Sequence, residues 1–187
     1  MKHLIGFVGQ NGAGKDTFTT FFRAAAAPLS VSRVRFSDVL YDTLRIWGIM
    51  PTRSNLQNMA IIMDRQYGKG TVTRATEARI KRQNADIIVV EGVRWKQDVP
   101  MIRSFKNSIL VYITAKPDVR FERLRKRGSK TAEEKLTWEQ FDREEKALTE
   151  LEIPEIGNLA DFKIDNNGTL GEFRQKVEEF YKGLHRR

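Results

Sequence analysis

The sequence contains no cysteine and only two histidines, His3 and His185. The lack of cysteine excludes disulfides, thiolate metal sites and cysteine nucleophiles. It also favours a reducing compartment, so we expect a cytoplasmic protein. Two histidines argue against a histidine-based metal site. No apolar run approaches the roughly 18 residues of a membrane-spanning helix, so we expect no membrane partner.

The first apolar run, residues 4–8, leads directly into a glycine-rich motif. It lacks the small-residue cleavage site that follows the apolar region of a secretory signal. We therefore interpret this run as a buried strand and not as a signal peptide.

The chain of 187 residues carries a net charge of +9. Three explanations are open: a nucleic-acid partner, a solvated surface rich in Lys and Arg, or a cleft that holds two polyphosphate anions. A phosphate-binding motif is present to use the charge, whereas the aromatic–basic interleaving of RNA-recognition modules is absent. We therefore regard a nucleic-acid partner as disfavoured and expect a small-molecule phosphate acceptor.

Short apolar runs alternate with segments of helical periodicity. The runs lie at 4–8, 31–36, 87–90, 109–113 and 162–164, and the helical segments at 16–27, 37–46, 54–68, 71–84, 117–128, 138–151 and 170–184. This alternation predicts an α/β fold with a parallel sheet covered on both faces, in three α/β/α layers. No composition break marks a boundary, so we expect a single domain over residues 1–187. The three helical segments between the second and third strands are where a substrate-binding insertion would lie.

The motif from Gly9 to Thr17 reads Gly-Gln-Asn-Gly-Ala-Gly-Lys-Asp-Thr and connects a strand to a helix. Its glycines let backbone amides turn inward around an anion, and the helix N-terminus adds partial positive charge. Lys15 can follow the charge on the phosphates during transfer and is a catalytic candidate. The predicted nucleotide-binding residues are Gly9, Asn11, Gly12, Ala13, Gly14, Lys15, Asp16 and Thr17.

One position of the motif departs from the usual pattern. Ser or Thr normally follows the lysine and ligates Mg²⁺, but here Asp16 follows it and Thr17 comes next. A carboxylate is a good hard ligand for Mg²⁺, so Asp16 is the first metal candidate. In the alternative, Asp16 caps the helix or faces the second substrate and Thr17 serves the metal.

The third strand is followed by Glu91-Gly92-Val93-Arg94. An acid at the carboxyl end of a strand beside the phosphate loop can hold Mg²⁺ or its waters, so Glu91 is also a metal candidate. Gly92 would let a substrate approach the backbone, and Arg94 could grip a phosphate with two parallel hydrogen bonds. We predict that these residues serve substrate binding and that Arg94 is catalytic, rather than forming a surface Glu–Arg pair.

The helix predicted at 117–128 ends in a basic run in which Arg123 and Arg127 share a face. One guanidinium could lie on the adenine ring and the other could contact the transferring phosphoryl group, so Arg123 is a nucleotide-binding candidate and Arg127 a catalytic one. The alternative is a solvated face whose charge suits the helix dipole. Arg143 lies in a helix rich in Glu and is either an ion-pair partner or a catalytic lid arginine.

Four residues near the predicted insertion are substrate-binding candidates. Asp38 follows the second strand and is either a first-turn helix acid or a substrate contact. Arg45, Arg53 and Gln57 lie within the insertion itself.

These motifs resemble P-loop nucleoside monophosphate kinases. Gly-Lys-Asp-Thr at 14–17 is similar to the loop of phage-type deoxynucleoside monophosphate kinases, and phosphomevalonate kinases share Gly-Lys-Asp. Phe-Ser-Asp-Val-Leu at 36–40 is similar to the Phe-Ala-Asp-Pro-Leu of the phage-type kinases. Glu-Gly-Val-Arg at 91–94 is similar to their Asp-Val-Arg and to the Asp-Gly-Phe-Pro-Arg of adenylate kinases, with Glu in place of Asp. The Arg-x-x-x-Arg at 123–127 matches the adenylate kinase lid.

Residues 160–168 resemble the end of dephospho-CoA kinases, in which the turn after the last strand lies along the adenine. This resemblance adds Asn167 and Gly168 to the nucleotide-binding candidates. The family resemblance implies ATP with Mg²⁺, a five-stranded parallel sheet in the order 2-3-1-4-5, an NMP-binding insertion near 37–84 and a short lid near 128–142.

The resulting hypothesis is transfer of the γ-phosphoryl group from ATP to a phosphate-bearing acceptor, first of all a (deoxy)nucleoside monophosphate, by a monomer or homodimer. Two alternatives remain at this stage. Phosphorylation of an alcohol, as in dephospho-CoA kinase, would use Asp38 as a base. A nucleotide-gated binding or assembly factor would use the loop as a switch.

Overall fold

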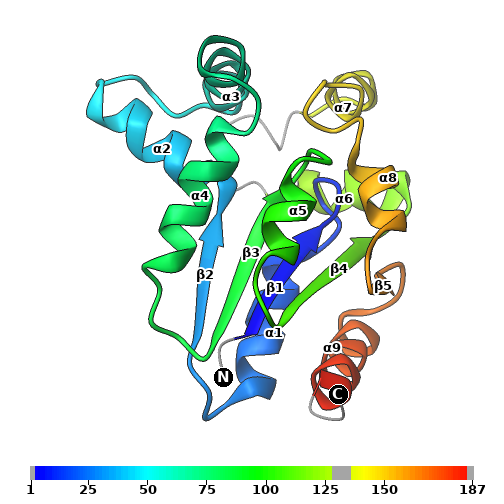
Figure 1. The fold of residues 1–187 in the computed structure, drawn as a ribbon. Coiled ribbons are helices and arrows are strands. Elements are labelled where there is room, and N and C mark those ends of the chain that lie inside the picture. The colour runs from blue at the N-terminus through cyan, green and yellow to red at the C-terminus, as the bar shows by residue number, and fades with distance from the viewer. Residues whose placement is uncertain (1–2, 128–135, 185–187) are drawn as a thin grey trace.

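The computed structural model describes residues 3–127 and 136–184. Five parallel strands form one sheet in the order β2-β3-β1-β4-β5, which confirms the predicted fold and strand order. The strands are β1 (His3–Val8), β2 (Val31–Arg35), β3 (Ile87–Val93), β4 (Ser108–Thr114) and β5 (Phe162–Asp165). Their carboxyl ends lie at the same edge of the sheet (Figure 1), where the loops that follow the strands can meet.

Alternation along the strands explains why the sheet is covered on both faces. In β1, Leu4 and Val8 belong to one buried cluster, while Ile5 and Phe7 belong to the other. All four side chains are almost fully buried. Successive side chains of a strand point to opposite faces, so a strand that is apolar throughout requires a layer of helices on each side.

One face is covered by α1 (Lys15–Ala26) and α9 (Leu170–Leu184). Aromatic rings fill this layer: Phe18 packs edge-on to Phe7 at 4.7 Å between centroids and lies 5.6 Å from Phe180. This rigid aromatic layer packs α1 against the sheet, and it therefore holds the N-terminus of α1 at the end of β1.

The opposite face is covered by α4 (Thr71–Lys81), α5 (Asp98–Arg103) and α8 (Ile153–Asn158), with buried residues such as Ile80, Ile102 and Ile156. Two more helices, α2 (Phe36–Ile46) and α3 (Arg53–Tyr67), extend this group beyond β2. Figure 1 shows α2, α3 and α4 beside β2, while α7 (Trp138–Glu145) and α8 lie on the side of β4.

Several element boundaries differ from the prediction. The short helices α5 and α8 were not predicted, because six residues with a proline in the first turn carry too little periodicity to be recognised. The helix predicted at 138–151 ends at Glu145, and α2 begins at Phe36 without Ser37 as its cap. The helix α6 (Pro117–Arg127) precedes the predicted lid, whose residues 128–135 lie outside the described part of the chain.

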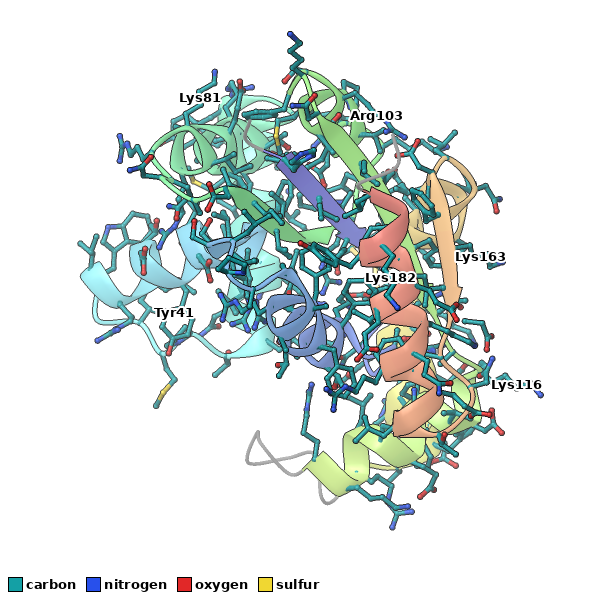
Figure 2. The ribbon with its side chains drawn as sticks, turned by 90° about the horizontal axis from the view of Figure 1, so that it is seen from below. Tyr41, Lys81, Arg103, Lys116, Lys163 and Lys182 are labelled. Carbon is teal, nitrogen blue, oxygen red and sulfur yellow. The ribbon has the colours of Figure 1, made fainter. Side chains whose placement is uncertain are left out.

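Basic side chains are spread over the surface. Figure 2 labels Lys81 on α4, Arg103 on α5, Lys163 on β5, Lys182 on α9, and Lys116 between β4 and α6, and all five are exposed. This distribution is typical of solvated surface charge. Within residues 3–127 and 136–184, no helix combines the length and apolar character needed to cross a membrane.

Candidate nucleotide and acceptor site

The phosphate loop connects β1 to α1 in the way that the motif predicts. At Gly9 a Cβ would lie only 2.3 Å from the backbone oxygen of Ile113, so the loop passes against β4 too closely for any side chain. The loop ends at Gly14, which has φ 104° and immediately precedes α1. The backbone of residues 9–14 and the first turn of α1 therefore form one continuous phosphate-binding segment.

Lys15 folds back over the phosphate loop. Its Nζ donates hydrogen bonds to the backbone oxygens of Gly9 at 2.6 Å and Gln10 at 2.8 Å. Burial, reinforced by the positive charge of Arg94, lowers the pKa of Lys15 to about 7. A bound polyphosphate would supply the negative charge that this ammonium group lacks.

Asn166 ties the last strand to the phosphate loop, although it was not predicted as a site residue. Its Nδ2 donates to the backbone oxygen of Ala13 at 2.9 Å, and Arg123 Nη1 donates to the backbone oxygen of Asn166 at 2.8 Å. A cavity of about 210 Å³ lies beside this contact, lined by Gly14, Thr17, Arg123, Asn166, Leu170 and Phe173. Thr17 and Arg123, both predicted to bind the nucleotide, thus line the same cavity.

Asn167 and Gly168, the other candidates in this turn, lie next to that cavity in the sequence but do not line it. Asn167 Oδ1 accepts a hydrogen bond from the backbone N–H of Lys116 at 2.7 Å, and Gly168 is exposed before α9. Asn167 therefore joins the turn to the segment between β4 and α6.

Two acids and two arginines meet at the ends of β2 and β3. Arg33 Nη2 lies 2.8 Å from Glu91 Oε2 and also pairs with the Asp16 carboxylate, and Arg35 Nη2 lies 3.1 Å from Asp16 Oδ1. Glu91 is buried, accepts a hydrogen bond from Thr19 Oγ1 at 2.7 Å, and has its pKa raised by burial. Arg35 Nε also lies 3.5 Å from Glu91 Oε2, so the two predicted metal-binding acids share two cations, the guanidinium groups of Arg33 and Arg35.

Gly92 gives β3 its shape beside this group. Phe7 pairs with Glu91 and Val8 pairs with Val93, so Gly92 is an extra residue in the ladder. Its φ of 86° is a conformation that favours glycine. The bulge lies between Glu91, which contacts Thr19 and Arg33, and Arg94, which contacts Thr149 and Glu150.

The group of residues around Arg94, which we call the acceptor side, contains Arg53, Gln57, Arg94, Thr149 and Glu150. Arg94 pairs with the Glu150 carboxylate and donates to the backbone oxygen of Thr149 at 3.4 Å. Arg53 Nη2 lies 3.6 Å from Glu150 Oε1, and Gln57 Nε2 donates to Thr149 Oγ1 at 3.1 Å. Burial, with the nearby charge of Arg53, lowers the pKa of Arg94 to about 10. Three residues predicted to bind substrate therefore converge here.

The loop that carries Arg94 is held by a buried acid. Asp98 Oδ2 accepts hydrogen bonds from the backbone N–H groups of Arg94 at 3.1 Å and Trp95 at 3.0 Å, and Asp98 Oδ1 accepts from Thr73 Oγ1 at 2.6 Å. Burial raises the pKa of Asp98. Asp98 therefore positions Arg94 through the backbone.

Arg120 links the phosphate loop to α7. The residue is only 3% exposed, its Nη1 lies 2.6 Å from Glu145 Oε2 and donates to the backbone oxygen of Asn11 at 3.3 Å. Its guanidinium carbon lies 5.3 Å from the centre of the Phe141 ring. A movement of α7 would therefore displace Arg120 and, through it, the phosphate loop.

The structure separates three of the other candidates, Asp38, Arg45 and Arg143, from these groups. The Asp38 carboxylate accepts from the backbone N–H of Arg35 at 2.8 Å and so serves as a cap of α2. Arg45 lies at the exposed end of α2 over the Tyr41 ring, and Arg143 is exposed on α7. Arg127 lies 4.0 Å from Asp16 Oδ2, on the side of the shared acids.

Sequence reasoning missed five functional candidates: Arg33, Arg35, Arg120, Glu150 and Asn166. For Arg33 and Arg35 a signal existed, because two arginines at i and i+2 lie on one face of a strand. Asn166 lies within residues 160–168, the segment that resembles the end of dephospho-CoA kinases. Glu150 had no signal, because it gains its importance only from the way the chain after α7 passes over Arg53 and Arg94.

The strand order, the phosphate loop and the flanking helices define a P-loop NTPase fold. A family model described as AAA domain matches residues 5–148. The sequence is 34% identical over 182 residues to a UPF0200 protein of Pyrococcus horikoshii, covering 94% of both chains. It is 32% identical over 190 residues to a UPF0200 protein of Staphylothermus marinus, covering 99% of this chain and 91% of that one. The chain therefore carries an AAA domain and belongs to the UPF0200 family.

Among solved structures, the chain is similar to the shikimate kinase of Acinetobacter baumannii in complex with shikimate, with a TM-score of 0.60 and 13% identity over 99% of this chain and 94% of that one. It is also similar to the shikimate kinase of Aquifex aeolicus, with a TM-score of 0.55 and 12% identity over 97% and 98% of the chains. At these identities the likeness establishes the kinase-type fold.

Proposed function

We propose that this protein is an ATP- and Mg²⁺-dependent phosphotransferase that moves the γ-phosphoryl group to a small phosphate-bearing acceptor, a (deoxy)nucleoside monophosphate. One observation carries the proposal: Lys15 Nζ folds over the phosphate loop, Arg53 and Arg94 converge on one carboxylate, and the charge of Arg94 contributes to the lowered pKa of Lys15. Three cations from the phosphate loop, β3 and α3 are therefore within electrostatic reach of one another. Such a group suits a reaction between two anionic substrates.

The residues present fit a divalent cation. Asp16 and Glu91 direct two carboxylates at the same guanidinium groups, those of Arg33 and Arg35, so this position is built to hold positive charge. Mg²⁺ commonly uses one or two carboxylates together with substrate phosphates and water. Asp16 and Glu91 would hold Mg²⁺ here, which when bound neutralises charge on the phosphates. Thr17 lines the cavity with Arg123 instead, which favours Asp16 over Thr17 as the metal residue.

In the proposed reaction, an oxygen of the acceptor phosphate forms a bond to the γ-phosphorus while the bond to the β–γ bridging oxygen breaks and ADP leaves. The acceptor oxygen is already ionised, so the chain needs no general base. Lys15 stabilises the charge that moves to the bridging oxygen, and Arg94 orients the acceptor. A hydroxyl acceptor would need a base, and Asp38, the base candidate, is engaged as a helix cap.

The test is a screen for ATP consumption with nucleoside and deoxynucleoside monophosphates, dephospho-CoA and phosphomevalonate, with product analysis. We expect a diphosphate product in a one-to-one ratio with ADP, and no product with Lys15→Ala. Slow ATP hydrolysis that depends on a macromolecular partner and on no small acceptor would instead support a nucleotide-gated binding protein. Product only from dephospho-CoA would support the alcohol kinase.

A further inference from the structure

Glu150 is a buried anion that the proposed chemistry does not require. It lies in the segment between α7 and α8, and its side chain is 1% exposed. The carboxylate pairs with Arg94 and lies 3.6 Å from Arg53 Nη2. Within the described residues, neither carboxylate oxygen has a partner of hydrogen-bond geometry. The chain has therefore buried a negative charge between two of its own predicted substrate-binding arginines.

A carboxylate held in this way is not a fully satisfied structural ion pair. Burial of two charges is favourable only when hydrogen bonds satisfy the remaining lone pairs. Arg53 divides its charge between Glu150 and Glu144, and Arg94 also donates to the Thr149 backbone. A phosphate group, with more acceptor oxygens and a larger charge, can make bidentate bonds to such arginines and would satisfy them better.

The segment that carries Glu150 is held mainly by polar contacts: Gln57 Nε2 donates to Thr149 Oγ1, Arg94 Nη1 to the Thr149 backbone oxygen, and the Lys96 backbone N–H to Glu152 Oε2. Leu148 and Leu151, on either side, are 69% and 53% exposed. Thr149 and Glu150 are the buried residues between them, and firm apolar packing resumes at Ile153 in α8. Withdrawal of this segment would therefore expose little apolar surface, and its cost lies in polar contacts that an incoming anion and water can replace.

We propose that Glu150 is a resident anion that occupies the position of the acceptor's phosphate between Arg53 and Arg94 and leaves that position when the acceptor binds. The proposal rests on the proposed function for the identity of the acceptor, but the presence of an anion position does not depend on turnover. Glu150 is then a specificity residue, because an acceptor must carry an anion able to displace a carboxylate. An uncharged small molecule would not open the site.

The test measures binding of inorganic phosphate, without nucleotide, by isothermal titration calorimetry at constant ionic strength. Glu150→Gln removes the charge and keeps the shape, so we expect its phosphate affinity to be at least about tenfold higher than that of the native protein. The matched control is Glu144→Gln, because the Glu144 carboxylate pairs with Arg53 and the side chain is 40% exposed. We expect a change of less than about twofold for this control.

Addition of Arg94→Met to Glu150→Gln distinguishes phosphate binding between Arg53 and Arg94 from phosphate binding at the phosphate loop. In Glu150→Gln/Arg94→Met the gained affinity should disappear, while weak binding at the loop remains. A folded Glu150→Gln protein with unchanged phosphate affinity, or a gain that survives Arg94→Met, would overturn the proposal.

A second measurement keeps the proposal testable if Glu150→Gln does not fold. Hydrogen–deuterium exchange of residues 146–152 is followed in the native protein with excess phosphate and with chloride at equal ionic strength. We expect at least about threefold faster exchange in phosphate, since the segment is released; equal exchange would contradict the displacement.

The outcomes also separate this inference from the proposed function. A gain of Arg94-dependent phosphate binding without phosphorylation of any monophosphate would leave the resident anion standing and end the kinase proposal. Phosphorylation of a monophosphate by the native protein, together with a Glu150→Gln variant that gains no phosphate affinity, would support the kinase proposal and overturn the resident anion.

Discussion

The phosphate loop and the acceptor side are built differently. Residues 9–17 are contiguous, and their shape is set by the backbone, as the close approach of Gly9 to Ile113 shows. The acceptor side is assembled from side chains of α3, the end of β3 and the segment after α7. A backbone-built site is preorganised before any ligand arrives, whereas a side-chain-built site can change its occupant.

The two sites also differ in how far negative groups of the chain compensate their positive charges. Lys15 is paired with two backbone oxygens, so its positive charge has only weak compensation. Arg53 and Arg94 instead contact carboxylates of the same chain. The loop is therefore ready for an anion, and the acceptor side already holds one. The predictions below test whether this contrast is functional.

Removal of the Lys15 charge should have the largest effect. We expect Lys15→Met to lower phosphoryl transfer by at least about 10³-fold, because the charge that follows the moving phosphoryl group is lost. The same variant should not lose stability. Burial lowers the pKa of Lys15 from 10.5 to about 7, so its ammonium group destabilises the folded state at neutral pH by roughly 2 to 5 kcal/mol.

Unfolding of Lys15→Met in urea, beside a phosphotransfer assay, checks both halves of this prediction. Reduced activity with an equal or higher free energy of unfolding fits a loop that stores an uncompensated charge. A large loss of stability would show instead that Lys15 holds the loop together.

Truncation of an acceptor-side arginine should act on one substrate only. We expect Arg94→Met to lower kcat/KM for the acceptor by about 100-fold, with less than about a threefold change in ATP affinity. Arg45→Met is the matched control, because Arg45 is exposed over Tyr41 at the far end of α2. Steady-state kinetics with each substrate varied in turn measures the difference. Equal losses for ATP and for the acceptor would contradict the assignment of Arg94 to the acceptor alone.

The backbone character of the loop can be tested with two glycines. We expect Gly9→Ala to destabilise the protein by about 2 to 4 kcal/mol, since its Cβ would meet a main-chain oxygen at 2.3 Å that cannot move aside. In Gly48→Ala the Cβ meets nothing within 4 Å, and only the φ of 69° is unfavourable, which costs about 1 kcal/mol. Thermal and urea unfolding compare them; equal losses would mean that the loop tolerates a side chain.

This contrast also explains what could be predicted from the sequence. The strand order followed from the family resemblance, and the alternation of apolar runs with helices indicated the parallel sheet. The phosphate loop was legible because its chemistry is local. Arg53 and Arg94 were found as candidates, but their partner Glu150 lies more than fifty residues further along the chain, and no local pattern marks a residue that matters through a distant contact. Asp38 and Arg45 were plausible by type, yet only the fold shows that one caps a helix and the other lies apart.

The smallest predicted effect is a pH dependence that the two sides should not share. Lys15 is protonated below its pKa of about 7 in the free protein, and a bound polyphosphate raises that pKa, so nucleotide binding takes up a proton above pH 7. We expect ADP affinity to be highest below pH 7 and to fall by about tenfold between pH 7 and 8.5.

For folding, the pH dependence that Lys15 causes has the opposite sign. The lowered pKa means that the native state binds fewer protons than the unfolded chain between about pH 7 and 10.5. This group therefore makes the free energy of unfolding rise with pH across that window. Arg94 has a pKa of about 10 and stays charged throughout the range, so phosphate binding at the acceptor side of Glu150→Gln should be flat from pH 7.5 to 8.5. Calorimetry at several pH values, with Lys15→Met as the control that flattens the ADP profile, measures both slopes. An ADP affinity that is independent of pH in the native protein would show that Lys15 is already fully charged, and the loop would then be no less compensated than the acceptor side.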